Sequence, residues 1–256
     1  MKNHSPARGH KAGKMLITII TILFSTVLLL GIALIIVSPG KPLPFLDENG
    51  ELLRGSLSEK TWVEINGVQQ GLFIKSKDLD QPVLLFVHGG PGMPEYWMTQ
   101  RYPTGLEEVF TVVWWDQRSA GLSYQSGLSP ETMTVEQFVS DTLAMTDYLR
   151  ERFGKDKIYL MGHSWGSFIG IQAAARAPER FHAYIGVGQL SQQIQSENIA
   201  YQYALAQYRA DGNDKMLQKL EAAPPSPTAP LPRNYLQIRD LYMHDIGIGT
   251  TRDMQS

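Results

Sequence analysis

The chain has 256 residues, of which 43% are hydrophobic and 19% charged, a length and composition that suit one globular domain with a sizeable core. Its formal net charge of −2 gives no electrostatic reason to expect a nucleic-acid partner. The lack of cysteine excludes disulfides, thiolate metal sites and a cysteine nucleophile.

The N-terminus combines a basic arm with a long apolar run. Residues 1–14 carry four basic side chains and no acidic one, and Met15–Val37 contains no charged residue. As a helix this run would be roughly 35 Å long, enough to cross the hydrocarbon core of a bilayer. A cleaved signal peptide is the alternative, but its apolar core is usually about 7–15 residues long. We predict a membrane anchor at 15–37 in contact with lipid, a cytoplasmic arm at 1–14, and an extracytoplasmic remainder.

A linker rich in proline and glycine is predicted at 38–59. Beyond it, the turn Asn66-Gly67 lies between the runs TWVEI and GLFIKS and predicts a β-hairpin. Two continuous apolar runs, PVLLFVHGG and FTVVWWDQ, predict strands that are buried on both faces.

Helices and strands then alternate. Apolar residues recur with helical spacing over 134–153, where a capping box of Thr134 and Gln137 can open the helix and Gly154 can close it. KIYLMGHS and AYIGVGQ are predicted strands on either side of a helix at Trp165–Ala177. Such alternation indicates a mostly parallel sheet covered on both faces, so residues 60–189 are predicted to form an α/β core.

The last part of the chain has a different pattern. Ser191–Leu220 is helical, polar and rich in tyrosine, the proline stretch Pro224–Pro232 interrupts this pattern, and Leu231–Ser256 has room for one more short helix. Residues 190–256 are therefore predicted to form an incomplete helical lid over the α/β core.

The sequence GHSWG, Gly162–Gly166, has the form G-x-S-x-G directly between a predicted strand and a predicted helix. This is the context of a nucleophile elbow, a tight turn that exposes a serine hydroxyl at a helix N-terminus. Side chains at Gly162 and Gly166 would collide with the neighbouring strand and helix. A glycine-rich turn with an incidental serine is the alternative. We predict that Ser164 is the nucleophile.

The loop HGGPG, His88–Gly92, follows an earlier strand and is suited to stabilising an oxyanion with a backbone N–H group. We expect Gly90 to donate from this loop, with Gly89 as the second choice, and Trp165 to donate from the elbow. His88 is expected to brace the loop by hydrogen bonding rather than to act as the general base.

A third stretch, WWDQRSAGLS, follows another predicted strand. Its Asp116 and Arg118 can form an ion pair that shapes the rim of the site. An ordinary polar turn after a strand would also fit this pattern.

Together, HGGPG, WDQR-x-x-G-x-S and G-x-S-W-G-S on an alternating α/β pattern with a lid resemble the proline iminopeptidase branch of the α/β-hydrolase family. The resemblance runs roughly from Leu52 to Asp245. It implies an α/β-hydrolase fold, Ser164 as nucleophile and Gly90 and Trp165 as oxyanion donors. It also implies removal of N-terminal residues, typically proline, from small peptide or amide substrates.

Two positions depart from the pattern of that family. Ser119 stands where a glycine is usual, in a turn that favours positive φ, and His163 stands where stricter aminopeptidases often have glycine. These departures bear on the specificity for proline and leave the serine chemistry unchanged.

The acid and base that would activate the serine are harder to place. In this fold the nucleophile is followed along the chain by an acid and then by a histidine. Only His182 and His244 follow Ser164; the first is expected just before a strand, at the end of the sheet opposite the site, and the second in the lid. The family's acid and histidine follow two further strands, and nothing after Leu231 resembles such a strand. We therefore expect a C-terminally truncated hydrolase that lacks the triad Asp and His, is inactive or nearly so, and exposes AYIGVGQ as an edge strand.

Several functions stay open at this point. The first is a serine hydrolase of the proline iminopeptidase type; the others are a catalytically dead, membrane-tethered binding module and an esterase of the same fold. Epoxide hydrolases use aspartate at the elbow, so Ser164 argues against that chemistry. No metal is expected, because no H-x-x-x-H or similar cluster occurs, and no cofactor, because no G-x-G-x-x-G opens a helix after a strand.

Overall fold

The structure is a computed structural model that describes residues 7–37, 40–228 and 230–247. The chain divides into two compact units, Met1–Val187 and Gly188–Ser256. Lys2, in the predicted basic arm, lies outside the described residues.

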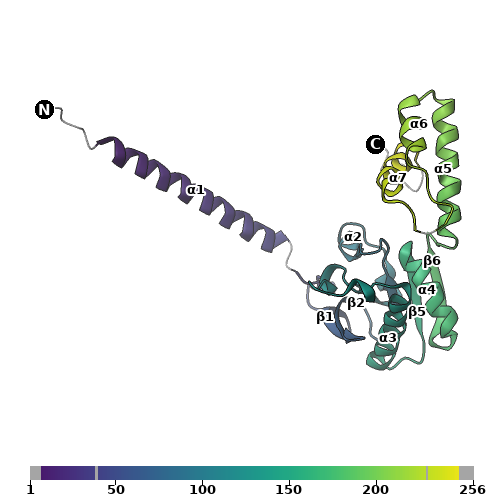
Figure 1. Ribbon diagram of the computed structural model, residues 1–256. Helices are drawn as coiled ribbons and strands as arrows, with labels where there is room; N and C mark the ends of the chain where they lie inside the picture. The colour runs from purple at the N-terminus through teal and green to yellow at the C-terminus, as the bar shows by residue number, and fades with distance from the viewer. Residues whose placement is uncertain (1–6, 38–39, 229, 248–256) are drawn as a thin grey trace. The chain divides into compact units, whose positions relative to one another are not determined.

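The first helix, α1, spans Ala7–Val37 and so begins about two turns before the predicted anchor (Figure 1). Its segment Gly13–Leu34 is long and apolar enough to cross a membrane, by length and composition. The apolar side chains described in this segment are not buried in the protein. A helix whose described side chains are apolar on all faces is suited to a lipid environment.

Strands β1 (Leu57–Ile65) and β2 (Val68–Ser76) form the predicted hairpin. Its turn holds Asn66 at φ 48° and Gly67 at φ 74°, the two left-handed residues that a tight hairpin turn requires. The pairing continues from Ile65↔Val68 to Leu57↔Ser76, so β1 begins inside the segment predicted as linker. Backbone pairing with β2 thus extends the strand beyond its apolar part, into the last three residues of that segment.

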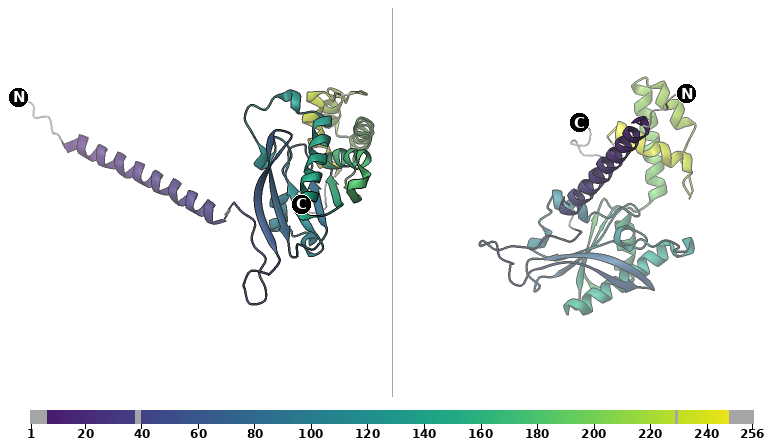
Figure 2. Two further views of the ribbon diagram at one scale, coloured as in Figure 1. Left: turned by 90° about the horizontal axis from the view of Figure 1, so that it is seen from below. Right: turned by 90° about the vertical axis from the view of Figure 1, so that its left-hand side faces the viewer.

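One six-stranded sheet, with the order β1-β2-β4-β3-β5-β6, forms the centre of the first unit. Strands β3 (Val83–Val87), β4 (Thr111–Trp115), β5 (Ile158–His163) and β6 (Phe181–Val187) are parallel, and β2 pairs antiparallel with β4. Figure 2 shows the blue hairpin running alongside these strands. Every residue of β3 and β4 is buried, as their continuous apolar runs predict.

Helices α3 (Val135–Phe153) and α4 (Trp165–Arg176) pack with one face of the sheet in the main apolar cluster. Thr134 caps α3 by accepting the Gln137 N–H at 3.1 Å, and Gly154 ends it at φ 61°, as predicted. A smaller cluster, which includes Phe86, Trp114 and Tyr96, lies on the other face. The remaining short helices of this unit are α2 (Tyr96–Arg101), η1 (Leu106–Glu108), η2 (Gly121–Ser123), η3 (Pro130–Thr132) and η4 (Pro178–Arg180).

The second unit contains α5 (Gln193–Ala210), α6 (Asp214–Glu221) and α7 (Arg233–Asp245) around an apolar cluster rich in tyrosine. The helix predicted to continue to Leu220 is broken, because Gly212 takes φ 64° and Asn213 caps α6 through the Met216 N–H. The carboxylate of Glu197, only 3% exposed, accepts hydrogen bonds from Arg239 at 2.8 Å and from Tyr235 at 2.6 Å. This satisfied network joins α5 to α7.

Candidate active site

Ser164 occupies a sharp turn between β5 and α4. Its backbone has φ 50° and ψ −116°, a left-handed conformation that serine rarely adopts. Strain of this kind persists only where the surrounding structure enforces it. The Ser164 N–H donates to Val187 O at 2.9 Å, which fastens the turn to the end of β6.

Two glycines allow this turn to be so tight. A β-carbon at Gly166 would fall on the carbonyl of Val87 in β3, 2.6 Å from its carbon atom. A β-carbon at Gly162 would meet the carbonyl of Gly166 in α4, 2.7 Å from its carbon atom. These distances confirm the predicted collisions with a strand and a helix.

The loop after β3 approaches the serine closely. A β-carbon at Gly89 would lie 3.2 Å from the Ser164 β-carbon, so only a residue without a side chain fits easily here. Gly90 has φ 116° and precedes a cis peptide bond to Pro91. The Gly89 N–H donates to Glu95 Oε1 at 3.0 Å, whereas the Gly90 N–H has no hydrogen-bond partner among the described residues. The geometry therefore favours Gly90 over Gly89 as the donor that remains available to a ligand.

Trp165 is the first residue of α4, and its N–H therefore has no carbonyl partner within the helix. Its indole packs edge-on against Phe138 of α3, with ring centroids 5.7 Å apart. This packing anchors the start of α4, where the helix dipole favours negative charge.

His88 is 1% exposed, and both of its ring nitrogens are engaged. Nε2 accepts the Gln117 N–H at 3.1 Å, so the proton lies on Nδ1, which donates to Gly89 O at 2.8 Å. Burial lowers the pKa of His88, partly offset by its bond to Gly89 and by the charge of Glu95. The ring is therefore a neutral link between the loop after β3 and the turn after β4.

The predicted ion pair between Asp116 and Arg118 is wrong. Arg118 instead forms a two-point ion pair with Asp141 of α3, at 2.7 Å from Nε and 2.9 Å from Nη2, and both side chains are buried. The two side chains have different partners, because Arg118 reaches Asp141 of α3 while Asp116 accepts a backbone N–H of its own loop. Ser119, the residue after Arg118, takes φ 63°. The family's glycine position thus keeps its positive φ with a serine in place.

Asp116 points in another direction and accepts the Leu122 N–H at 2.8 Å. Burial raises the pKa of Asp116 to about 6, although the bond from Leu122 opposes the shift. The side chain is only 4% exposed and helps to hold the loop that leads into η2.

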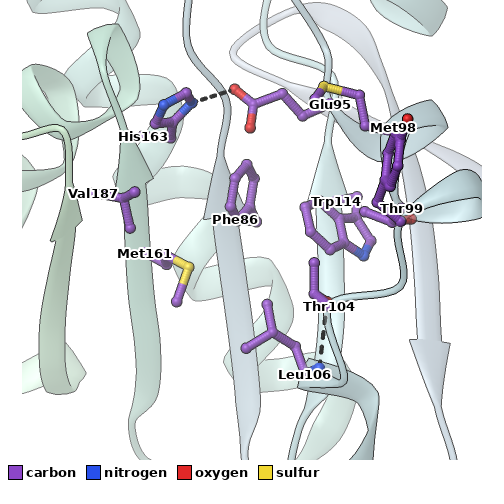
Figure 3. A pocket seen from close by; sticks show the side chains of 11 residues that line it. Phe86, Glu95, Met98, Thr99, Thr104, Leu106, Trp114, Met161, His163 and Val187 are labelled. Carbon is purple, nitrogen blue, oxygen red and sulfur yellow. Dashed lines mark hydrogen bonds and ion pairs between the residues drawn. The ribbon is translucent and has the colours of Figure 1, made fainter. Parts of the chain in front are cut away.

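Sequence reasoning missed Glu95, which comes five residues after Gly90. Its Oε1 atom lies 2.7 Å from His163 Nδ1 (Figure 3). The same atom accepts the Gly89 N–H. Glu95 and His163 form the polar end of a cavity of about 380 Å³ whose other walls include Phe86, Trp114 and Met161. No local motif marks Glu95, because His163, which is 68 positions away along the chain, is brought to it by the fold.

The two histidines that follow the serine have ordinary surroundings in their own units. His182 is the second residue of β6 rather than a loop residue before it, and its ring lies 5.2 Å from that of Tyr159. His244 is exposed in the last turn of α7. Within the described segments, no hydrogen bond from the Ser164 side chain caps α4, and no cluster of three or more metal-ligating side chains is present.

A strained serine between a parallel strand and a helix, facing a glycine-rich loop from the neighbouring strand, defines the class of this protein. The chain belongs to the α/β-hydrolase family, whose profile, described as alpha/beta hydrolase fold, matches residues 82–242. The predicted fold class is thereby confirmed.

Several relatives of this chain are named as aminopeptidases or proline iminopeptidases. The chain is 41% identical over 141 residues to the probable aminopeptidase YbaC of Bacillus subtilis (strain 168), and this alignment covers 55% of this chain and 44% of that protein. It is 27% identical over 136 residues to a proline iminopeptidase of Thermoplasma volcanium, covering 53% of this chain and 44% of the relative. A solved structure, the proline iminopeptidase-related protein of Thermus thermophilus, is similar with a TM-score of 0.49 and 22% identity, over 75% of this chain and 67% of that one. The chain thus spans less than half the length of the two sequence relatives.

Proposed function

We propose that this chain is a membrane-anchored serine hydrolase of the aminopeptidase type, which releases N-terminal residues, proline favoured, from small peptides. The observation that carries the proposal is Ser164 at φ 50° between β5 and α4, with the loop of Gly89 and Gly90 against it. The relatives named as aminopeptidase and proline iminopeptidase support the choice of reaction.

In the proposed reaction, Ser164 Oγ attacks the carbonyl carbon of the N-terminal residue and forms a C–O bond. The carbonyl electron pair moves to the oxygen, and the N–H groups of Gly90 and Trp165 stabilise the resulting anion. The hydroxyl proton passes to a base and then to the leaving amine, which departs as the C–N bond breaks. Water hydrolyses the acyl-serine in a second step of the same kind.

The described residues of the first unit do not supply this base, because none of their histidines or carboxylates is hydrogen-bonded to the Ser164 hydroxyl. Triad members typically contribute about four to six orders of magnitude to kcat. We therefore propose that these residues alone hydrolyse their substrate very slowly. The same observation favours a second candidate, a membrane-tethered binding module that keeps the pocket without the chemistry.

A fluorophosphonate probe separates the two candidates. We expect the full chain to be labelled slowly at Ser164, because the oxyanion donors act without a base. The S164A variant should remain unlabelled, because it lacks the hydroxyl that the probe phosphonylates. Mass spectrometry of the labelled peptide identifies the modified residue. Labelling at another residue contradicts the hydrolase proposal, and a chain that takes no label supports the binding module.

We also propose that α1 anchors the chain in a membrane, with the basic arm cytoplasmic and the rest outside. The support is the apolar segment Gly13–Leu34 and the basic residues before it. The proposed division of the chain is 1–14 arm, 15–37 anchor, 38–59 linker, 60–189 core and 190–256 lid.

The chain should stay with membranes after alkaline carbonate extraction, and deletion of Met15–Val37 should release it into the soluble fraction. Protease added outside intact cells should digest the hydrolase unit. Release of the full-length chain by carbonate would argue against a spanning helix, and complete protection from protease would reverse the orientation.

A further inference from the structure

One carboxylate oxygen lies between the two segments that surround the nucleophile. Glu95 Oε1 accepts the Gly89 N–H at 3.0 Å and lies 2.7 Å from His163 Nδ1. Since a carboxylate is an acceptor, His163 Nδ1 must carry the proton of this second bond. Figure 3 shows the Glu95 side chain reaching across to the His163 ring.

Each partner of Glu95 is the immediate neighbour of a residue proposed to act in the reaction. Gly89 precedes Gly90, the proposed oxyanion donor of the loop after β3. His163 precedes Ser164, which in turn precedes the second donor, Trp165. The two donors follow different strands, β3 and β5, so the distance between them depends on the contacts that link the loop to the elbow.

Glu95 is itself held firmly enough to act as that link. Its backbone carbonyl accepts the Met98 N–H at 3.0 Å at the start of α2. The next residue, Tyr96, is 7% exposed and stacks on Phe73 of β2, with ring centroids 4.0 Å apart. The Glu95 side chain does not cap its own helix and is 20% exposed, so its carboxylate is directed to the two segments instead. Bonds of this kind to a charged acceptor are about twice as strong as neutral ones.

We propose that Glu95 is a positioning residue that clamps the oxyanion loop to the nucleophile elbow and thereby sets the distance between the two oxyanion donors. This proposal rests on the proposed serine hydrolase function. Misplacement of reacting groups by about 1 Å can cost 100-fold in rate. Loss of this one link should therefore lower the reaction rate strongly and change the stability of the fold little.

The test compares the full chain with E95A, E95Q and the control variant E131A, whose side chain is exposed in η3. The rate of Ser164 labelling by a fluorophosphonate is measured over a range of probe concentrations. We expect E95A to lower the maximal labelling rate by about tenfold to 100-fold while half-saturation stays unchanged. E95Q should retain most of the rate, because its amide oxygen still accepts both bonds, and E131A should match the original chain.

Amide hydrogen exchange of the same variants tests the clamp without any catalysis. In E95A, exchange should become faster in both the Gly89 loop and the Ser164 elbow, whereas E131A should leave both unchanged. A wild-type rate of labelling in E95A, or an elbow whose exchange does not change, would overturn the proposal. If the original chain takes no label, the proposed function fails, and faster exchange at both segments still supports the clamp.

Discussion

Replacing Gly166 by alanine is expected to disrupt the nucleophile elbow. The new β-carbon would fall on the Val87 carbonyl and lie 2.7 Å from the His88 carbonyl oxygen, and neither backbone can move without disturbing the centre of the sheet. Overpacking of a dense core costs about 1–3 kcal/mol and occasionally more, and a clash with backbone belongs at the upper end. Denaturant unfolding followed by tryptophan fluorescence measures the loss, and labelling of Ser164 should fall with it.

Gly31→Ala is the matched control for this variant. Gly31 lies in α1, and a β-carbon there would meet nothing within 4 Å. Its unfolding curve and labelling rate should match those of the original chain. A Gly166→Ala variant that behaves like this control would show that the elbow is looser than the structure indicates.

The second large effect is expected from Asp141→Ala, which removes one partner of the buried ion pair with Arg118. The guanidinium, on a residue only 3% exposed, would lose both of its bonds to the carboxylate. The side-chain amides of Asn66, Gln70 and Gln137 also donate to Asp141 and would lose their acceptor. Breaking a buried pair in this way typically costs about 3–5 kcal/mol, because an uncompensated charge remains inside. Urea unfolding of the full chain in detergent measures this change.

An exposed pair on the same helix provides the comparison. Glu136 of α3 bonds to Arg176 through both oxygens, at 2.5 and 2.8 Å, but its side chain is 70% exposed. Glu136→Ala should therefore change stability far less than Asp141→Ala, since water screens the exposed charges. Equal effects of the two substitutions would mean that burial does not decide the strength of these pairs.

Much of the fold was predictable because its signals are local. The hairpin turn needs only Asn66 and Gly67, and the ends of α3 need only Thr134, Gln137 and Gly154. The extent of β1 was not predictable in this way, because its first residues join the strand by pairing with β2. The break between α5 and α6 depends on the left-handed backbone of Gly212. The spacing of apolar residues, on which the helix prediction rests, carries no information about this backbone angle.

In the candidate site, too, the features with local sequence signals were predictable and those that depend on long-range contacts were not. Ser164 and its flanking glycines are specified by five consecutive residues, and the structure places them at the expected turn. The residues that form ion pairs and hydrogen bonds with charged side chains were not predictable, because they are distant in sequence and become neighbours only in the folded chain. Arg118 pairs with a residue 23 positions away, and Glu95 contacts His163 across 68 positions.

The hydrogen bond from the Ser164 N–H to Val187 O has a mechanical consequence. Val187 is the last residue of β6, and the chain passes directly from it into the second unit through Gly188, at φ 56°. The residue that leads into the second unit is therefore tied to the nucleophile turn twice, by this bond of 2.9 Å and by the pairing of His163 with Val187 at the end of β5. The position of the serine therefore depends on the end of the outermost strand, at the point where the chain leaves the sheet.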